Sequence, residues 1–126
     1  MKPKLLFTLS AIYLGLSGLG VLISPAAVMG LGAGASTHLI AQARIQASLY
    51  IGIAVLNWFT RNAETSKARD AIFLGNTVIF GLMAILFGML MFTGEPVTGW
   101  VIVAIALFFA VAFFVTGRAN MSTNVS

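Results

Sequence analysis

The chain has 126 residues, of which 60% are hydrophobic and only 8% are charged, with a formal net charge of +4. A soluble domain carries about 25% charged residues, so this chain lacks the polar surface that a globular protein in water requires. Cysteine is absent, which excludes disulfides and thiolate metal sites, and no basic stripe interleaved with aromatic residues indicates nucleic-acid binding. The composition predicts an integral membrane protein whose solvent is lipid.

Four long apolar runs predict an all-α bundle of four transmembrane helices. The first run, 5–23, reaches roughly 28 Å as a helix, close to the hydrocarbon thickness of a bilayer. It is longer than the apolar core of a signal peptide, so we expect an uncleaved first span. Ser24 and Pro25 end this run, and we expect the glycine-rich stretch 26–34 to form a short segment at the membrane interface.

The second run is the most polar, and a dense group of charges separates it from the third. A Gly-Glu-Pro turn separates the third run from the fourth, because glycine ends a helix and proline begins the next. We therefore expect a single domain over residues 1–126, with spans at about 5–23, 37–59, 71–92 and 100–116, a charged connection and first helical turn at 60–70, a turn at 93–99, and a frayed polar tail at 117–126.

The distribution of basic residues predicts the orientation of the spans. With four spans, both ends of the chain and the 60–70 connection share one side of the membrane. Cytoplasmic loops carry the excess of Lys and Arg, so the topology is predicted to be N-in and C-in. We expect these residues to set topology and to do little else. They are six of the seven Lys and Arg residues: Lys2, Lys4, Arg61, Lys67, Arg69 and Arg118.

Arg44 is the seventh basic residue, and the topology rule does not place it. It lies about 10 Å along the second predicted helix, on the side opposite to the other basic residues. An arginine at the bilayer centre costs about 2.5–3.5 kcal/mol on insertion scales, and less near an interface. Two interpretations stay open: a partner inside the bundle, for which Glu95 is the candidate carboxylate, or a side chain that snorkels to the interface.

The polar residues of the second helix form the candidate ligand site. On a helical wheel, one arc holds His38, Gln42, Gln46, Tyr50 and Asn57. Arg44 points nearly to the other side. Such groups need partners in lipid, so one interpretation is a small-molecule site near His38, Gln42, Gln46 and Arg44. The other, which we favour, is hydrogen bonding between helices at about 0.6–2 kcal/mol per bond.

A second polar pair, Asn57 and Asn76, falls at similar depth in the second and third helices. We expect these side chains to bond across the hairpin as structural contacts. His38 is the only histidine, and with no cysteine or acid cluster the sequence predicts no metal site and no cofactor.

Small residues recur on three of the predicted helices at spacings that let helices approach closely. Phe and Met residues then fill the core and face lipid. The small-residue stripes are Ala11, Gly15 and Gly18 in the first helix, Gly81, Ala84 and Gly88 in the third, and Ala106 and Ala110 in the fourth.

The stretch 43–76 resembles small four-helix proteins of the bacterial inner membrane, and the size and topology are similar to DoxX-like proteins. The matching positions include Arg44, the Leu-Asn-Trp ending of the second helix at 56–58, Arg61, Arg69 and the Gly-Asn pair at 75–76. The resemblance implies a helical bundle and a multi-pass location in the bacterial inner (plasma) membrane. It implies no active site.

These patterns predict a non-enzymatic accessory or structural subunit that contacts lipid and packs against partner membrane proteins or against itself. The alternative is a small-molecule or lipid-binding carrier that uses the polar residues around Arg44. An enzyme is the least supported class, because the protonatable residues are dispersed and acid–base catalysis needs them together.

Overall fold

The computed structural model describes residues 1–25, 36–94 and 99–122, and the regular structure within them is helical. The expected interfacial segment at 26–34 and Glu95, with its hypothetical contact to Arg44, lie outside these ranges. Each of the four helices is long and apolar enough to cross a membrane, as predicted from the sequence. The helices are α1 (Pro3–Ile23), α3 (Thr37–Thr60), α4 (Lys67–Met91) and α5 (Gly99–Ala119).

Serine side chains fix where two of these helices begin. The Ser36 hydroxyl accepts a hydrogen bond from the Leu39 backbone N–H, and the Ser66 hydroxyl accepts one from Arg69. Each bond satisfies a backbone donor that has no partner within the helix. The Ser66 cap starts α4 at Lys67, within the 60–70 segment that was expected to contain the first turn of this helix.

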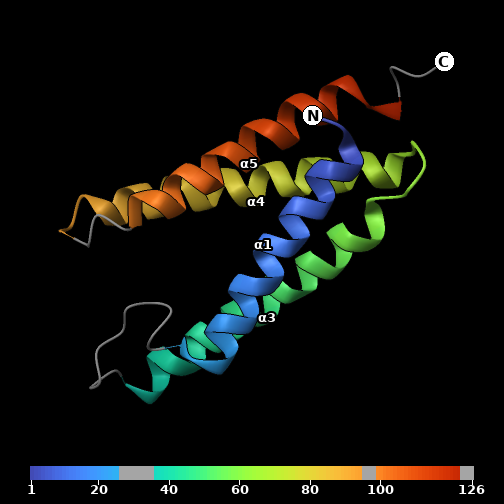
Figure 1. Cartoon of the computed structure of the whole chain (residues 1–126). Coiled ribbons are helices and arrows are strands. Elements are labelled where there is room, and N and C mark those ends of the chain that lie inside the picture. The colour runs from blue at the N-terminus through green and yellow to red at the C-terminus, as the bar shows by residue number, and fades with distance from the viewer. Residues whose placement is uncertain (26–35, 95–98, 123–126) are drawn as a thin grey trace. The chain divides into compact units, whose positions relative to one another are not determined.

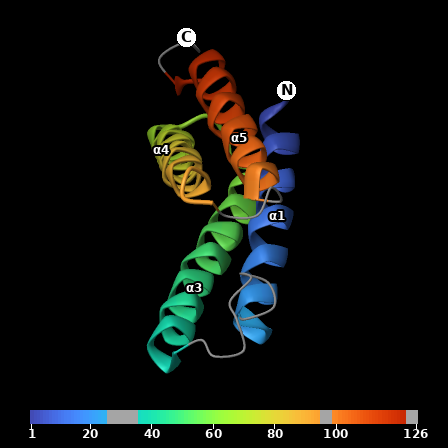
Figure 2. The same ribbon diagram turned by 90° about the vertical axis from the view of Figure 1, so that its left-hand side faces the viewer.

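The chain divides into two compact units, which are described separately. One holds Phe7–Arg61 and is an antiparallel hairpin of α1 and α3, and the other holds Met1–Leu6 and Asn62–Ser126 and contains the hairpin of α4 and α5. The ribbon views show α1 running beside α3, and α4 beside α5 (Figures 1 and 2). The expectation of a single domain stays a prediction.

The α1–α3 hairpin is held by close backbone approach at small residues. A Cβ atom placed on Gly18 would lie 2.8 Å from Ile51 Cγ1 and 3.1 Å from the Ala47 carbonyl oxygen. Beside this point, Val21, Ala43 and Ala47 form a small buried apolar cluster. This outcome agrees with the predicted role of the small residues of α1 in helix packing.

The α4–α5 hairpin has an aromatic core. Phe80 is fully buried and stacks on Phe109, with ring centroids 4.8 Å apart, and also on Phe113 at 5.9 Å. Phe73 meets Phe113 edge-on at 6.2 Å, and its side chain packs against Gly117. These rings form a connected buried cluster between the two helices.

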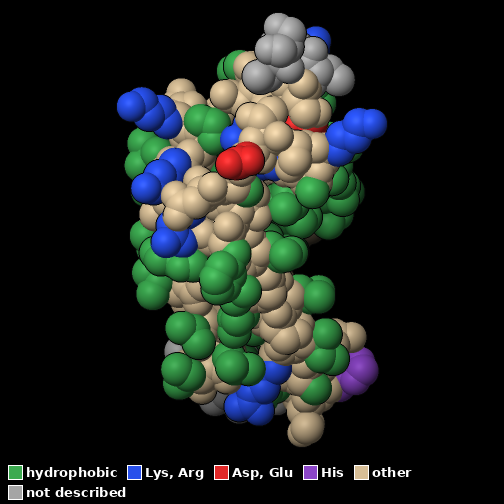
Figure 3. All heavy atoms as spheres, turned by 90° about the vertical axis from the view of Figure 1, so that its right-hand side faces the viewer, with side chains coloured by type: hydrophobic (Ala, Val, Ile, Leu, Met, Phe, Trp, Pro, Cys, Tyr) green, Lys and Arg blue, Asp and Glu red, His purple; other side chains and the backbone are tan. Residues whose placement is uncertain are grey.

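Large apolar side chains cover much of the outer surface of the helices. They are green in the space-filling view of Figure 3. Only 17% to 39% of the most apolar window of each helix is buried. Phe59 and Phe92, for example, are 77% and 85% exposed. An apolar surface of this extent needs lipid or protein against it.

Candidate functional site

The polar arc predicted on α3 is present, and its members pair along the helix itself. Gln42 Nε2 lies 3.1 Å from His38 Nε2, and Gln46 Nε2 donates a 2.6 Å hydrogen bond to the Tyr50 hydroxyl. His38, Gln42 and Arg44 are exposed, and Gln46 is half-buried. In the described parts of the chain, no hydrogen bond joins Arg44 to this arc, so their action as one ligand site stays a prediction.

Asn57 makes a contact between helices, and its partner in α1 is Ser10. Both residues are fully buried. Asn57 Nδ2 donates to Ser10 Oγ at 3.0 Å, and this hydroxyl donates to the Phe7 carbonyl oxygen at 3.0 Å. Asn76 donates to the Ile72 carbonyl of its own helix at 2.9 Å. Because Asn57 and Asn76 belong to different units, the expected bond between them stays a prediction.

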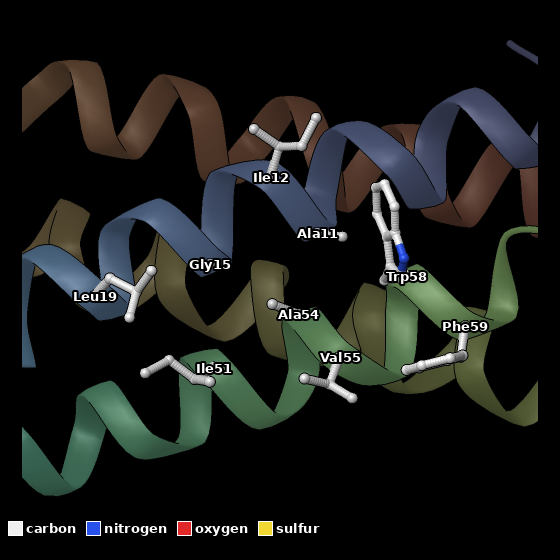
Figure 4. Close-up of a pocket in the computed structure, with 9 residues that line it drawn as sticks. All are labelled: Ala11, Ile12, Gly15, Leu19, Ile51, Ala54, Val55, Trp58 and Phe59. Atoms are coloured by element: carbon white, nitrogen blue, oxygen red, sulfur yellow. The ribbon is translucent and has the colours of Figure 1, made fainter.

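An open apolar groove of about 260 Å³ lies between α1 and α3. Its middle is lined by Ala11, Gly15 and Ala54, whose small side chains leave the space unfilled. In Figure 4, Leu19 and Ile51 face each other at one end of the groove, and the indole of Trp58 reaches toward α1 at the other. The remaining lining residues are Ile12, Val55 and Phe59.

A positive charge marks the Trp58 end of this groove. The Arg61 guanidinium carbon lies 3.8 Å from the centre of the Trp58 ring, and Arg61 Nη1 donates a 2.6 Å hydrogen bond to the Trp58 carbonyl oxygen. These two contacts hold the guanidinium plane against the indole. The hairpin 7–61 contains Arg44 and Arg61 and no Asp or Glu.

A second polar arrangement joins the start of α4 to the end of the chain. The Asp70 carboxylate accepts hydrogen bonds from the Ser122 backbone N–H at 3.1 and 3.2 Å and from the Ser122 hydroxyl at 2.5 Å. Arg69 Nη2 donates to the Asn120 carbonyl oxygen at 2.9 Å, and Arg69 Nη1 donates to the Ala63 carbonyl oxygen at 3.3 Å. We call this set of five residues the tail clamp.

The tail clamp corrects two predictions. The tail from 117 is not frayed as far as the structure describes it, because α5 continues to Ala119 and the clamp holds the next residues. Arg69 was expected only to set topology, yet it also bonds the tail and the 60–66 connection. A short polar tail is predicted to fray from its composition, but it is ordered when specific hydrogen bonds hold it.

Within the described ranges, no group of three or more His, Asp or Glu side chains could hold a metal ion. Comparison of the chain with protein-family models, curated proteins and solved structures found no match. The resemblance to DoxX-like proteins therefore stays a prediction, and function has to be inferred from the groove, the helix surfaces and the charges.

Proposed function

We propose that this protein is a small, non-enzymatic, multi-pass membrane protein that serves as an accessory or structural subunit. In this proposal it lies in the bacterial inner membrane with both ends in the cytoplasm, and its helices pack against partner membrane proteins. Four helices of membrane-spanning length and composition support the membrane location. The basic residues at the ends and in the 60–70 connection support the orientation.

The open small-residue stripe of α4 is the observation that carries the proposed packing role. A Cβ atom added at Gly81 or Gly88 would meet no atom of a neighbouring element within 4 Å, and Ala84 lies between them on the same side of the helix. The equivalent glycine of α1, Gly18, is already in tight contact with α3. Within a bilayer, small residues let a partner backbone come close, and van der Waals packing then drives association.

The carrier alternative receives less support from the polar side chains of α3. His38 pairs with Gln42, and Gln46 pairs with Tyr50, within single helical turns. Binding sites for small molecules are concave and place a few polar groups so that they converge. Here the pairs run along one helix and Arg44 stands apart, so we favour the subunit.

The test is to block the α4 stripe and to recover the protein from its native membrane in a gentle detergent. The combined substitution Gly81→Leu and Gly88→Leu should reduce partner recovery at least fivefold, because the larger side chains hold a partner helix away. Gly52→Leu is the matched control, since Gly52 is an exposed glycine of α3 whose Cβ position is equally open. Recovery is measured by cross-linking followed by mass spectrometry.

Two results would contradict the subunit role. One is a wild-type protein that is recovered only as a free monomer. The other is a double variant that keeps its normal helix content by circular dichroism and still retains every partner.

A further inference from the structure

We infer that the groove between α1 and α3 binds an anionic phospholipid, with part of an acyl chain in the groove and the phosphate at Arg61. This inference goes beyond the proposed packing role. It concerns a different helix pair and would hold with or without a protein partner.

The groove has the dimensions and chemistry of a hydrocarbon site. Its walls extend from Ala11 to Leu19 in α1 and from Ile51 to Phe59 in α3, which is about 12 Å along each helix. At about 260 Å³ it is smaller than the roughly 300–1,000 Å³ pockets that enclose whole small molecules. An apolar, open and narrow space of this kind suits one stretch of acyl chain.

The charge at the Trp58 end selects the headgroup. An arginine presents five N–H donors in a planar fork that matches the oxygens of a phosphate. One of these donors is given to the Trp58 carbonyl oxygen, and the stacked indole fixes the plane of the remainder. Tryptophan itself favours the level of the headgroups, where its ring is apolar and its N–H is polar. The apolar groove and the N–H donors of Arg61 are therefore adjacent, as the acyl chain and the phosphate are adjacent in a phospholipid.

The same charges disfavour a second copy of the hairpin as the occupant. The hairpin 7–61 carries two arginines and no carboxylate, so a facing copy would bring like charges together and would offer Arg61 no anion. An anionic lipid would supply both an anion for Arg61 and an acyl chain that fills the groove.

Fluorescence quenching of Trp58 measures this binding directly. The chain has two tryptophans, so Trp100→Phe leaves Trp58 as the only one. The protein is reconstituted in phosphatidylcholine vesicles in which part of the lipid carries brominated acyl chains, either as phosphatidylglycerol or as phosphatidylcholine. We expect about fivefold tighter association of the anionic lipid, the effect of one arginine next to an anionic headgroup.

Two matched pairs of variants separate the headgroup contact from the acyl contact. Arg61→Gln should remove the preference for phosphatidylglycerol, while Arg44→Gln, the other arginine of the hairpin, should leave it unchanged. Val55→Phe fills the groove from its exposed side and should lower quenching by both lipids at least twofold. Val101→Phe, an exposed valine of α5 outside this groove, should not.

Four results would overturn the inference. The first is equal quenching by the two lipids, and the second is a preference that survives Arg61→Gln. The third is a preference lost equally in Arg44→Gln, which would assign it to the general surface potential. The fourth is absence of quenching together with cross-linking of α1 to a second copy, which would show that protein fills the groove.

Discussion

Gly18 and Gly52 lie in facing helices of one hairpin, and their surroundings differ sharply. A Cβ atom at Gly18 would press on Ile51 Cγ1 and on the backbone oxygen of Ala47, whereas one at Gly52 would meet nothing within 4 Å. Gly18→Ala should therefore destabilise the hairpin by about 1–3 kcal/mol, the usual cost of overpacking. Gly52→Ala should stabilise it by about 0.5–1 kcal/mol, because alanine is the better helix former.

Reversible unfolding of the two variants in mixed detergent micelles, followed by circular dichroism, checks this difference. Equal stabilities of the two variants would mean that α1 and α3 do not approach as closely as the structure places them.

At the scale of single residues, some contacts between helices could be predicted from the sequence and others could not. The small-residue stripe of α1 was predicted from spacing, and Gly15 and Gly18 do face α3. The polar character of Asn57 indicated a contact between helices, but its partner Ser10 was missed. A lone serine in an apolar run gives no signal, because its hydroxyl can bond its own helix backbone anywhere. Only the register of α1 against α3 brings Ser10 to Asn57.

Among the elements, the start of α4 and the end of α5 depend on each other through the tail clamp. The Asp70 carboxylate offers only acceptors to the two Ser122 donors, and it lies in the first turn of α4, where the helix dipole favours a negative charge. The tail was predicted to be frayed because the contacts that order it join residues about 50 positions apart, and such polar contacts leave no local signal in the sequence. Hydropathy reports the apolar body of a helix and not its polar ends.

Asp70→Asn should loosen the tail, because it removes the negative charge and replaces one of the two acceptor oxygens that bind Ser122 with an N–H donor. A loss of about 1–2 kcal/mol is expected for these hydrogen bonds. The readout is limited trypsin cleavage after Arg118, which should become about 5- to 30-fold faster as the end of α5 opens more often. Glu64→Gln is the control, since Glu64 is an exposed carboxylate of the preceding connection. Unchanged cleavage of Asp70→Asn would mean that the clamp does not hold the tail.

For the whole molecule, the four helices follow from hydropathy alone, because a run of about 20 apolar residues is a strong and local signal. The packing within each hairpin was predicted only in outline. The small residues pointed to close contacts, but the aromatic core of Phe73, Phe80, Phe109 and Phe113 has no signature that separates it from phenylalanines facing lipid. The groove beside Trp58 likewise exists only once α1 and α3 are paired.

Orientation in the membrane is the property of the whole chain that charge predicts. Because the chain has no cysteine, single cysteines can report the two sides of the membrane without further changes. Thr37 is exposed at the start of α3, on the side that is predicted to lack basic loops, and Glu64 is exposed in the basic connection between α3 and α4. If the basic residues face the cytoplasm, a membrane-impermeant maleimide should label Thr37→Cys in intact cells. It should label Glu64→Cys only after the membrane is opened. The reverse labelling pattern would place Arg61 and the tail clamp outside the cell and Arg44 on the cytoplasmic side. Arg44 would then follow the rule that basic residues face the cytoplasm, and the other six Lys and Arg residues would break it.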